Sequence, residues 1–432
     1  PIGAALYLPA LTGLGIWAAW FLVRRTKTPE GQNVADVQLD VAKRHGVVRT
    51  RPVVVRTLAS AITLGSGGSA GSEGPVAVLG AAVGSAFGRV MRLQPRHVKI
   101  LVGCGAAAGI AGAFNAPFAG ALFALEEVLG SFSVAAFSPV VIASVVDALT
   151  AHSVLGTHPA FHMPAVVDVH PVANALLYPL LGIACGLISA LYATLTVRMP
   201  RWSARLGGPA WLRPVAGGLL VGAITAASGG LLSGTGHLSI PPAVFGGMVW
   251  YALIALALAK VFATALTLGT GGSGGVFTPS LFIGAALGGG CGRLLQAVVP
   301  DHLIHPEAWA LVGMGGVVAG ATRAPLTAIF MVYELTNDSA YVVPLMIVAV
   351  ISLLTAKRFS PYGLYDGWLV EKGEHVSHGI DEALMHRLHV RDVLDPNGAR
   401  VTPATHVLEL SLVASRTPQD AVAVVEEDGT LV

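Results

Sequence analysis

Long runs of apolar residues alternate with short polar joints along most of this chain. In the first part, Pro1 to Val23, Leu101 to Gly130 and Ser133 to Leu155 are each long enough to cross a lipid bilayer as helices. The apolar runs of the second part are Leu176 to Thr196, Pro214 to Ser228, Met248 to Leu268, Pro279 to Val299, Trp309 to Leu335 and Tyr341 to Lys357. This pattern predicts an all-α integral membrane protein with many spans.

Proline interrupts two of these runs at related places. The run from Leu101 is broken at Asn115-Ala116-Pro117, and the run from Trp309 is broken at Arg323-Ala324-Pro325. Irregular backbone survives at membrane depth only where it is enclosed by protein or lines a cavity. The broken helices therefore predict a site inside the protein rather than at its lipid-facing surface.

Composition supports the membrane class and excludes others. The chain is 54% hydrophobic and only 12% charged, whereas soluble domains carry roughly 25% charged residues. Its formal net charge of +2 gives no reason to expect nucleic acid as a partner. The three cysteines, Cys104, Cys185 and Cys291, lie in apolar segments without metal or disulfide spacing, so we interpret them as packing residues. Because the chain starts inside an apolar run, we also interpret it as a fragment.

A basic segment orients the chain in the membrane. The first apolar run ends in Arg24-Arg25, and the segment from Thr26 to Arg56 is polar and basic, with a short helix expected from Gly31. Positive charge next to a span favours the cytoplasmic side. We expect a multi-pass protein of the plasma or inner membrane, with its C-terminal tail in the cytoplasm.

The stretch from Leu64 to Arg89 carries the most informative chemistry. Its first half is crowded with glycine and serine, Glu73 lies in the middle, and an apolar helix is expected from Pro75. A glycine-rich turn before a helix exposes unpaired N–H groups at the positive end of the helix dipole, which makes an anion site. Glu73 is placed to occupy that site itself.

This stretch occurs twice. Residues Ala59 to Arg89 match Ala263 to Arg293 without a gap, and 16 of the 31 positions are identical. Within the match, Ser72-Glu73-Gly74 is replaced by Val276-Phe277-Thr278. A second block, Asn115 to Glu127, answers Arg323 to Leu335. Two halves built on one plan, with broken helices at corresponding positions, are typical of membrane transporters whose site lies between the repeats.

The character of the chain changes after Lys357. Phe359 to Gly373 is amphiphilic and holds Tyr362 and Tyr365, and the chain is polar from Glu374 onward. The tail has the pattern strand, turn, helix, strand, with Asp428-Gly429 as a hairpin turn. It resembles the opening half of a cystathionine-β-synthase (CBS) domain. We therefore expect a membrane domain over 1–373, with halves of about 1–172 and 173–373, and a partial CBS domain over 374–432.

Three motifs in order resemble the signatures of the CLC family of chloride channels and chloride/proton antiporters. They are Gly71 to Pro75 (GSEGP), Ala113 to Glu127 (AFNAPFAGALFALEE) and Gly274 to Pro279 (GGVFTP). The resemblance implies two inverted-topology repeats of broken and tilted helices, and a homodimer in which each subunit has its own anion path. It implies transport of chloride or similar anions in exchange for protons. It implies no enzyme activity, no metal and no cofactor, although a complete pair of CBS domains would offer a nucleotide site.

The resemblance also assigns roles to single residues. Glu73 matches the gating glutamate, which competes with the anion and carries protons. Glu127 matches the internal proton-transfer glutamate, which distinguishes antiporters from most channels. The residues expected to bind the anion are Val276 and Phe277 through their backbone N–H groups, Tyr365 through its hydroxyl, and the loop residues Gly71, Ser72, Gly74 and Gly275. Tyr362 is the alternative to Tyr365. The simpler alternatives are an ion pair with a cation such as Arg56 for Glu73, a surface acid at a helix end for Glu127, and core packing for Phe277.

Two departures from the family pattern bear on the anion. Ser72 stands where the family usually has a basic residue. The family's GSGIP motif, whose serine donates its hydroxyl to the central anion, is matched here only by Gly31-Gln32-Asn33-Val34-Ala35. We expect the Gln32 or Asn33 amide to donate in place of the missing serine. The preferred anion is left open, with nitrate and fluoride as alternatives to chloride.

Other function classes fit less well. Gly269-x-Gly271-x-x-Gly274 satisfies a dinucleotide-binding pattern, but Leu294, Leu295 and Gln296 stand where the required acid would lie. No Lys-Ser/Thr pair follows either glycine loop, so a P-loop fails too. A sensor or scaffold that works through its CBS tail would need no paired anion loops. Within the transport class, Glu127 favours an antiporter over a passive CLC-type channel.

Overall fold

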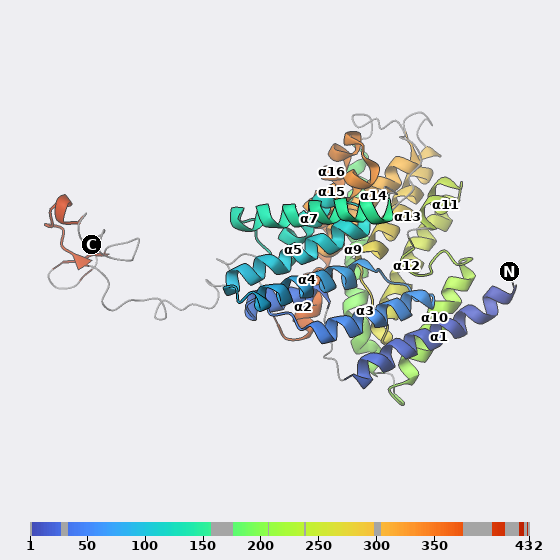
Figure 1. Cartoon of the computed structure of the whole chain (residues 1–432). Coiled ribbons are helices and arrows are strands. Elements are labelled where there is room, and N and C mark those ends of the chain that lie inside the picture. Colours follow the sequence, from blue (N-terminus) through green and yellow to red (C-terminus); the bar gives the residue numbers. More distant parts are fainter. Residues whose placement is uncertain are drawn as a thin grey trace. The chain divides into compact units, whose positions relative to one another are not determined.

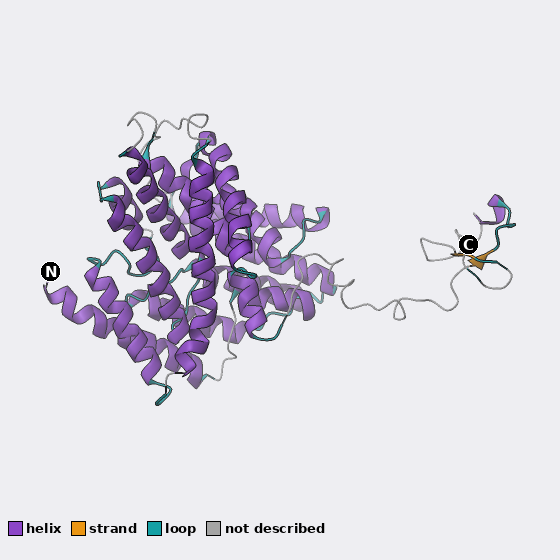
Figure 2. Cartoon of the chain, turned by 180° about the vertical axis from the view of Figure 1, so that it is seen from behind, coloured by secondary structure: helices purple, strands orange, loops and turns teal. Residues whose placement is uncertain are grey.

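The computed structural model describes residues 2–26, 33–156, 176–205, 207–236, 239–297, 304–374, 400–410, 423–426 and 430. The chain separates into two compact units, Pro1–Val376 and Ser377–Val432. The first unit is built from helices (Figures 1 and 2), and in the part of the chain that the structure describes, strands occur only in the second unit. The all-α membrane fold predicted from the apolar pattern is confirmed.

The helices follow the order of the predicted apolar runs. Those of the first half are α1 (Ile2–Arg25), α2 (Val34–Lys43), α3 (Thr50–Gly65), α4 (Glu73–Val90), α5 (Pro95–Phe114), α6 (Pro117–Phe123), the π-helical turn η1 (Ala124–Val128) and α7 (Val134–Leu155). Those of the second half are α9 (Tyr178–Arg205), α10 (Leu212–Ala227), α11 (Ile240–Phe245), α12 (Trp250–Thr270), α13 (Phe277–Gln296), α14 (Pro306–Thr322), α15 (Pro325–Thr336), the 3-10 turn η3 (Ser339–Tyr341), α16 (Val342–Phe359) and α17 (Leu364–Glu371). The expected boundary between the halves, at 172/173, lies outside the described residues.

Two helix starts differ from the sequence-based expectation. The short helix expected from Gly31 begins at Val34, because the Asn33 side chain caps it by accepting a hydrogen bond from the Asp36 N–H at 3.1 Å. The helix expected from Pro75 begins at Glu73, where the Val76 N–H closes the first turn on the Ser72 carbonyl at 3.2 Å. Glu73 is therefore part of the first turn of α4 and not of the loop before it.

The predicted helix breaks are confirmed in both halves. Asn115 ends α5 in the left-handed region (φ 56°) and Arg323 ends α14 in the same way (φ 74°). A proline then opens the next helix in each case, where its missing N–H costs nothing. The two breaks bring α6 and α15 beside one another, although they are far apart in the sequence.

Glycines allow equivalent helix pairs to pack closely in the two halves. A Cβ at Gly80 or Gly84 of α4 would overlap the backbone of α5, and a Cβ at Gly284 or Gly288 of α13 would overlap that of α14. These contacts occupy corresponding positions in the repeat. Small residues spaced four apart let helices approach without lipid between them. The repeat seen in the sequence is thus also present in the packing of these helix pairs.

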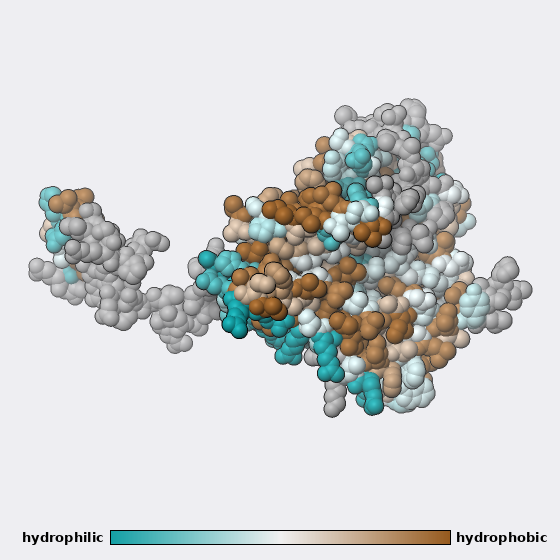
Figure 3. Space-filling model, in the orientation of Figure 1, coloured by the Kyte–Doolittle hydropathy of each residue, from teal (hydrophilic) through white to brown (hydrophobic). Residues whose placement is uncertain are grey.

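The first unit presents an apolar surface of the kind a bilayer covers. Five helices are long and apolar enough to cross a membrane in the described part of the chain, and α7 is the least buried of them. Hydrophobic surface lies over α5 and α7, and hydrophilic residues gather near α2 and the joint between α4 and α5 (Figure 3). The exposed residues at that joint include Arg92, Arg96 and His97. The chain is an integral membrane protein.

The second unit is described over short segments only. Strands β1 (Arg400–Val401) and β2 (Ala423–Val424) pair in parallel, and the Val425 N–H donates to the Val401 carbonyl at 2.8 Å. The expected turn at Asp428-Gly429 lies outside the described residues. The resemblance to a CBS domain stays a prediction.

Candidate functional site

The two glycine loops meet in the interior of the first unit. The Gly71 N–H donates to the Gly275 carbonyl at 2.8 Å, and the Gly275 N–H donates to the Gly71 carbonyl at 2.7 Å. The loops thus form one antiparallel bridge between the halves. The backbone amides of these two glycines are engaged with one another, and a Cβ on either would meet the Glu73 carboxylate, so the glycines leave room for that side chain.

A second exchange of hydrogen bonds flanks this bridge. The Ser69 N–H donates to the Thr267 hydroxyl oxygen, and the Ser273 N–H donates to the Thr63 hydroxyl oxygen, both at 3.1 Å. The Ser69 and Thr264 hydroxyl groups also lie 3.1 Å apart. Each loop is therefore held by the helix that precedes the other loop.

Glu73 reaches from the first half into the second loop. Its carboxylate accepts hydrogen bonds from the Thr278 N–H at 2.9 Å and from the Thr278 hydroxyl at 2.6 Å. The side chain is buried, with a relative exposure of 1%. A carboxylate held by the N–H groups at the start of a helix occupies the position in which such a helix binds anions. That this is also the site of the transported anion stays a prediction.

Val276 and Phe277 begin α13 beside this contact. Both are buried, and the Val276 carbonyl accepts a hydrogen bond from the Tyr192 hydroxyl at 3.3 Å. The Phe277 ring packs against Phe114 and Phe123, with centroids 5.7 and 6.2 Å apart. Phe277 therefore packs in the core, as the simpler interpretation expected, and its role as an anion ligand stays a prediction.

A cavity of about 830 Å³ opens beside the two loops. Gly74, Gly275, Val276, Asn33 and Tyr365 are among the residues that line it. It is also lined by the basic side chains of Arg24, Arg56, Arg201, Arg213 and Lys372. A polar cavity rich in positive charge raises the local concentration of small anions.

Three of the predicted anion-site residues, Gly71, Ser72 and Phe277, do not line this cavity. Ser72 is exposed. Gln32 lies outside the described residues. Asn33 lines the cavity, and its side-chain oxygen is engaged in the cap of α2. Any donation to an anion must therefore come from its amide nitrogen.

Glu127 lies in the π-helical turn η1 and is buried, with a relative exposure of 4%. The Gln38 amide nitrogen donates to the Glu127 backbone carbonyl at 2.7 Å and to its Oε2 atom at 3.2 Å. Tyr365 is close enough to interact electrostatically with both Glu127 and Glu73. Single π-helical turns are frequent at functional sites. The surface-acid interpretation of Glu127 does not fit a side chain buried to this extent.

Glu126, the neighbour of Glu127, points to the other half. Its carboxylate accepts from the Leu326 N–H at 3.2 Å and from the Thr327 N–H and hydroxyl at 2.8 Å each. Glu334, its counterpart in the repeat, accepts from the Phe118 and Ala119 N–H groups at 2.8 Å. Each glutamate thus caps the first turn of the broken helix in the opposite half.

Lys260 is fully buried and supports the outside of the first loop. Its ammonium donates to the Leu232 carbonyl at 3.1 Å and to the Gly234 carbonyl at 2.9 Å, and it lies 5.3 Å from the centre of the Phe282 ring. The Gly234 carbonyl also accepts from the Ala70 N–H at 3.3 Å. The described hydrogen bonds of Lys260 therefore go to the segment that covers the loop and not to the loop itself.

Three residues of the site were missed by sequence reasoning. Thr278 is part of the triplet Val276-Phe277-Thr278, which replaces Ser72-Glu73-Gly74 in the second repeat. That difference was the available signal for Thr278. Gln38 is polar among Val34, Val37 and Val41 on one face of α2, which was a second signal. For Tyr192, in the middle of the apolar helix α9, the sequence offers no signal. In the described part of the chain, no group of three or more His, Cys, Asp and Glu side chains is placed to hold a metal ion.

An all-α membrane fold with two equivalent halves, interrupted helices and an interior site between them defines a channel or secondary transporter. A family model described as voltage gated chloride channel matches residues 14–357. The chain belongs to this family, and it has the CLC fold.

Relatives and a solved structure agree with this assignment. A ClcB-like chloride channel protein of Ralstonia nicotianae is 35% identical over 369 residues, which cover 84% of this chain and 85% of the relative. The H(+)/Cl(-) exchange transporter ClcA of Yersinia pestis is 31% identical over 358 residues, covering 81% and 74%. The crystal structure of a CLC-type fluoride/proton antiporter is similar with a TM-score of 0.69 and 27% identity, covering 85% and 92%.

Proposed function

We propose that this protein moves chloride or a similar small anion across a membrane in exchange for protons. The observation that carries the proposal is the Glu73 carboxylate, which is bound by the N–H group and hydroxyl of Thr278 at the start of α13. A site that binds a carboxylate through neutral donors binds chloride in the same way. Partial charges attract the ion and still release it quickly.

Proton coupling follows from the two states of Glu73. The ionised carboxylate mimics the anion and competes with it for the donors. The protonated side chain carries no charge, so it yields the site to the anion and takes a proton with it. Relatives named as proton exchangers support this assignment, including the ClcA transporter of Yersinia pestis.

Glu127 supplies the second proton site and separates the antiporter from the channel. It is buried on the side of α2 and α17 and does not touch the glycine loops in the described contacts. A carboxyl group there lets protons enter by a route other than the anion path. The alternative is a passive anion channel, in which Glu127 has no transport role.

The choice of anion is a separate question. Asn33 lies at the position of a motif that this chain alters, and it lines the cavity. The structurally similar fluoride/proton antiporter keeps fluoride in consideration. Chloride is our first choice because Tyr365 and Glu127 are both present, whereas relatives that prefer fluoride tend to lack their equivalents.

The remaining expectations complete the proposal. The protein forms a homodimer in the plasma or inner membrane, and its tail after Gly373 lies in the cytoplasm. The tail forms part of a CBS domain, which binds a nucleotide only when a second such domain completes the pair. The exposed apolar side chains of α7, among them Phe137, Val146 and Leu149, are suited to lipid or to a second subunit.

The test is anion flux from proteoliposomes with the external pH recorded at the same time. Proteoliposomes with the wild-type protein are expected to take up protons as anions leave, so the external pH should rise, and no metal or cofactor should be needed. Glu73→Gln should move anions without protons and without pH dependence. Glu127→Gln should also stop proton movement but keep pH-sensitive anion flux, because the Glu73 carboxyl group is still present. Anion flux by the wild type without any proton counterflow would replace the antiporter by the channel.

A further inference from the structure

Gln38 is a buried amide in an apolar setting, and its described hydrogen bonds all go to one residue, Glu127. Gln38 lies on the face of α2 that also carries Val34, Val37 and Val41, and its relative exposure is 2%. This helix packs against η1, which carries Glu127. A polar side chain on a buried apolar face costs stability unless its hydrogen bonds are made. Both described hydrogen bonds from the Gln38 amide nitrogen go to Glu127.

The geometry of the two bonds decides which end of the amide faces the carboxylate. One Nε2 hydrogen goes to the Glu127 backbone carbonyl at 2.7 Å, and Nε2 also lies 3.2 Å from Glu127 Oε2. A rotated amide would place its oxygen against the backbone carbonyl oxygen, which repels it. The backbone of Glu127 therefore fixes the amide so that an N–H always faces the carboxylate.

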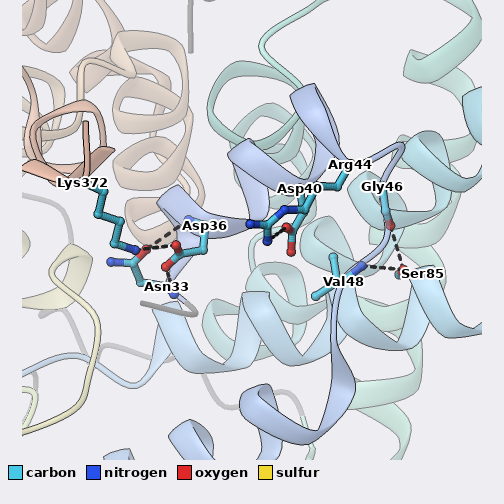
Figure 4. A network of polar contacts seen from close by, with 8 residues as sticks. All are labelled: Asn33, Asp36, Asp40, Arg44, Gly46, Val48, Ser85 and Lys372. Carbon is cyan, nitrogen blue, oxygen red and sulfur yellow. Dashed lines mark hydrogen bonds and ion pairs between the residues drawn. The ribbon is translucent and has the colours of Figure 1, made fainter. Parts of the chain in front are cut away.

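The helix that carries Gln38 is itself held at both ends (Figure 4). At its start, Asn33 and Asp36 cap one another, and Asp36 also pairs with Lys372 after α17. Just after its end, the Ser85 hydroxyl of α4 donates to the Gly46 carbonyl at 2.7 Å and accepts from the Val48 N–H at 2.9 Å, while Arg44 pairs with Asp40 of the same helix. The two acids of α2 are thus each paired with a cation, and the helix that carries Gln38 is anchored on both sides of that residue.

The charged groups around Glu127 give it no compensating cation among its described partners. The acids that interact with it electrostatically are Asp366 at the start of α17 and its neighbour Glu126, and the Tyr365 hydroxyl is also near. Glu126 is occupied by the first turn of α15. Gln38 is accordingly the side chain that donates to the Glu127 carboxylate in the described part of the chain.

We propose that Gln38 is a positioning residue for proton transfer: it holds Glu127 Oε2 with a fixed N–H, so that Oε1 takes and releases the transported proton. This inference rests on the proposed proton exchange. In each cycle an O–H bond of a hydronium ion breaks as an O–H bond at Glu127 Oε1 forms, and a water molecule is left. The reverse step releases the proton, and Gln38 is unchanged. The Gln38 Oε1 atom is buried and accepts no hydrogen bond from a described residue, so the amide is held by its Nε2 side alone.

The experiment measures proton and anion flux from proteoliposomes of the full chain at several pH values. Gln38→Met keeps the length of the side chain but removes the N–H. Proton flux should fall roughly tenfold, as expected for one lost hydrogen bond to a charged group, while anion flux stays within about twofold of wild type. The pH of half-maximal proton flux should rise, because the ionised carboxylate loses its donor.

Two further variants separate positioning from packing. Val41→Ala loosens the same face of α2 without touching Glu127, and it should keep the wild-type ratio of proton to anion flux. Gln38→Glu provides a donor only when its own carboxyl is protonated, so its proton flux should recover toward acid pH. Recovery would not follow from a purely structural role.

The outcomes also separate this inference from the proposed function. A wild-type protein without proton counterflow would overturn the proposed function and the inference with it. If the wild type is coupled and Glu127→Gln is not, a Gln38→Met variant with the wild-type flux ratio and pH profile would overturn the inference alone. An equal loss in Val41→Ala, or no acid recovery in Gln38→Glu, would do the same.

Discussion

At the scale of single residues, the two halves share the binding of one carboxylate. Glu73 comes from the first half, and both of its described donors belong to Thr278 in the second. The sequence predicted the glutamate because a lone acid in an apolar glycine loop is conspicuous. It did not predict the threonine, because hydroxyl groups are common in membrane helices and their partners depend on contacts between distant parts of the chain.

The Thr278 hydroxyl should hold the gate closed. Thr278→Ala removes one of the two bonds to Glu73, and hydrogen bonds to charged groups contribute about 1.5–3 kcal/mol each. The anion loses the same donor, but a chloride ion accepts a weaker hydrogen bond than a carboxylate does, so its apparent affinity should still rise, by less than about tenfold, where Glu73 is ionised. The measurement is anion flux as a function of anion concentration at alkaline pH. Thr278→Ser keeps the hydroxyl and should match the wild type; an unchanged affinity in Thr278→Ala would contradict this role.

Side chains introduced at Gly71 or Gly275 should displace the gating glutamate, Glu73. A Cβ at Gly71 would overlap the Glu73 carboxylate, and a Cβ at Gly275 would lie 2.7 Å from it and 2.8 Å from the Gly74 nitrogen. Gly71→Ala should therefore displace Glu73 and make anion flux less sensitive to pH. Gly275→Leu should abolish flux in a protein that is still folded, as judged by its elution and thermal unfolding. Wild-type flux in Gly275→Leu would show that the loop does not line the anion path.

At the scale of helices, much of the arrangement was predictable and the pairing was not. The breaks at Asn115 and Arg323 follow from the proline two positions later, which is local information. The caps exchanged by Glu126 and Glu334 join residues about 200 positions apart, and no periodicity in the chain contains that contact. Gln38 was missed for the same reason, because its polar character among the valines of α2 does not reveal a partner 89 positions away.

Glycine packing should control the stability of the helix pairs. Gly288 and Gly289 are neighbours on α13, but a Cβ at Gly288 would overlap the Trp309 carbonyl, whereas a Cβ at Gly289 would meet its nearest atom at 3.5 Å. Gly288→Ala should lower the free energy of unfolding by about 1–3 kcal/mol through overpacking. Gly289→Ala should be neutral or raise it slightly, since alanine favours helix. Thermal unfolding in detergent would measure both, and equal effects would argue against the crossing described.

The exchanged caps should contribute similarly in the two halves. Glu126→Gln and Glu334→Gln each remove the charge from hydrogen bonds to the first turn of a helix, and capping interactions contribute about 0.5–2 kcal/mol. Each variant should therefore lower the free energy of unfolding by a similar amount, measured by thermal unfolding. Anion flux should remain in both, because neither side chain lines the cavity. A large loss in one half only would show that the caps are not equivalent.

At the scale of the whole molecule, the exchanged bonds tie the halves together at their centre. Separating the halves would break the bridge between Gly71 and Gly275 and the two bonds between serine and threonine beside it. Buried hydrogen bonds are costly to leave unmade. Transport in this protein is therefore expected to depend on side-chain movement at Glu73 more than on rocking of one half against the other.

A covalent link between the halves tests this expectation. The Ser69 and Thr264 side-chain oxygens lie 3.1 Å apart and belong to different halves. The double variant Ser69→Cys, Thr264→Cys should form a disulfide on oxidation and still transport anions at a rate within about twofold of the reduced protein. The single variants, treated with the same oxidant, serve as controls. Loss of flux on oxidation of the double variant, restored by reduction, would show that the halves must move apart.

The bridge also has a consequence for how the duplicated halves diverged. Gly71 and Gly275 exchange backbone hydrogen bonds, and a Cβ on either would meet the Glu73 carboxylate, so neither copy of the loop was free to gain a side chain at that position. The three residues that follow in each half, Ser72-Glu73-Gly74 and Val276-Phe277-Thr278, carry no such reciprocal bond to their own counterparts. They were free to specialise, one copy as the charge that moves and the other as the donor that receives it. The two halves therefore differ in function from the residue that follows the matched glycines, Ser72 in one half and Val276 in the other.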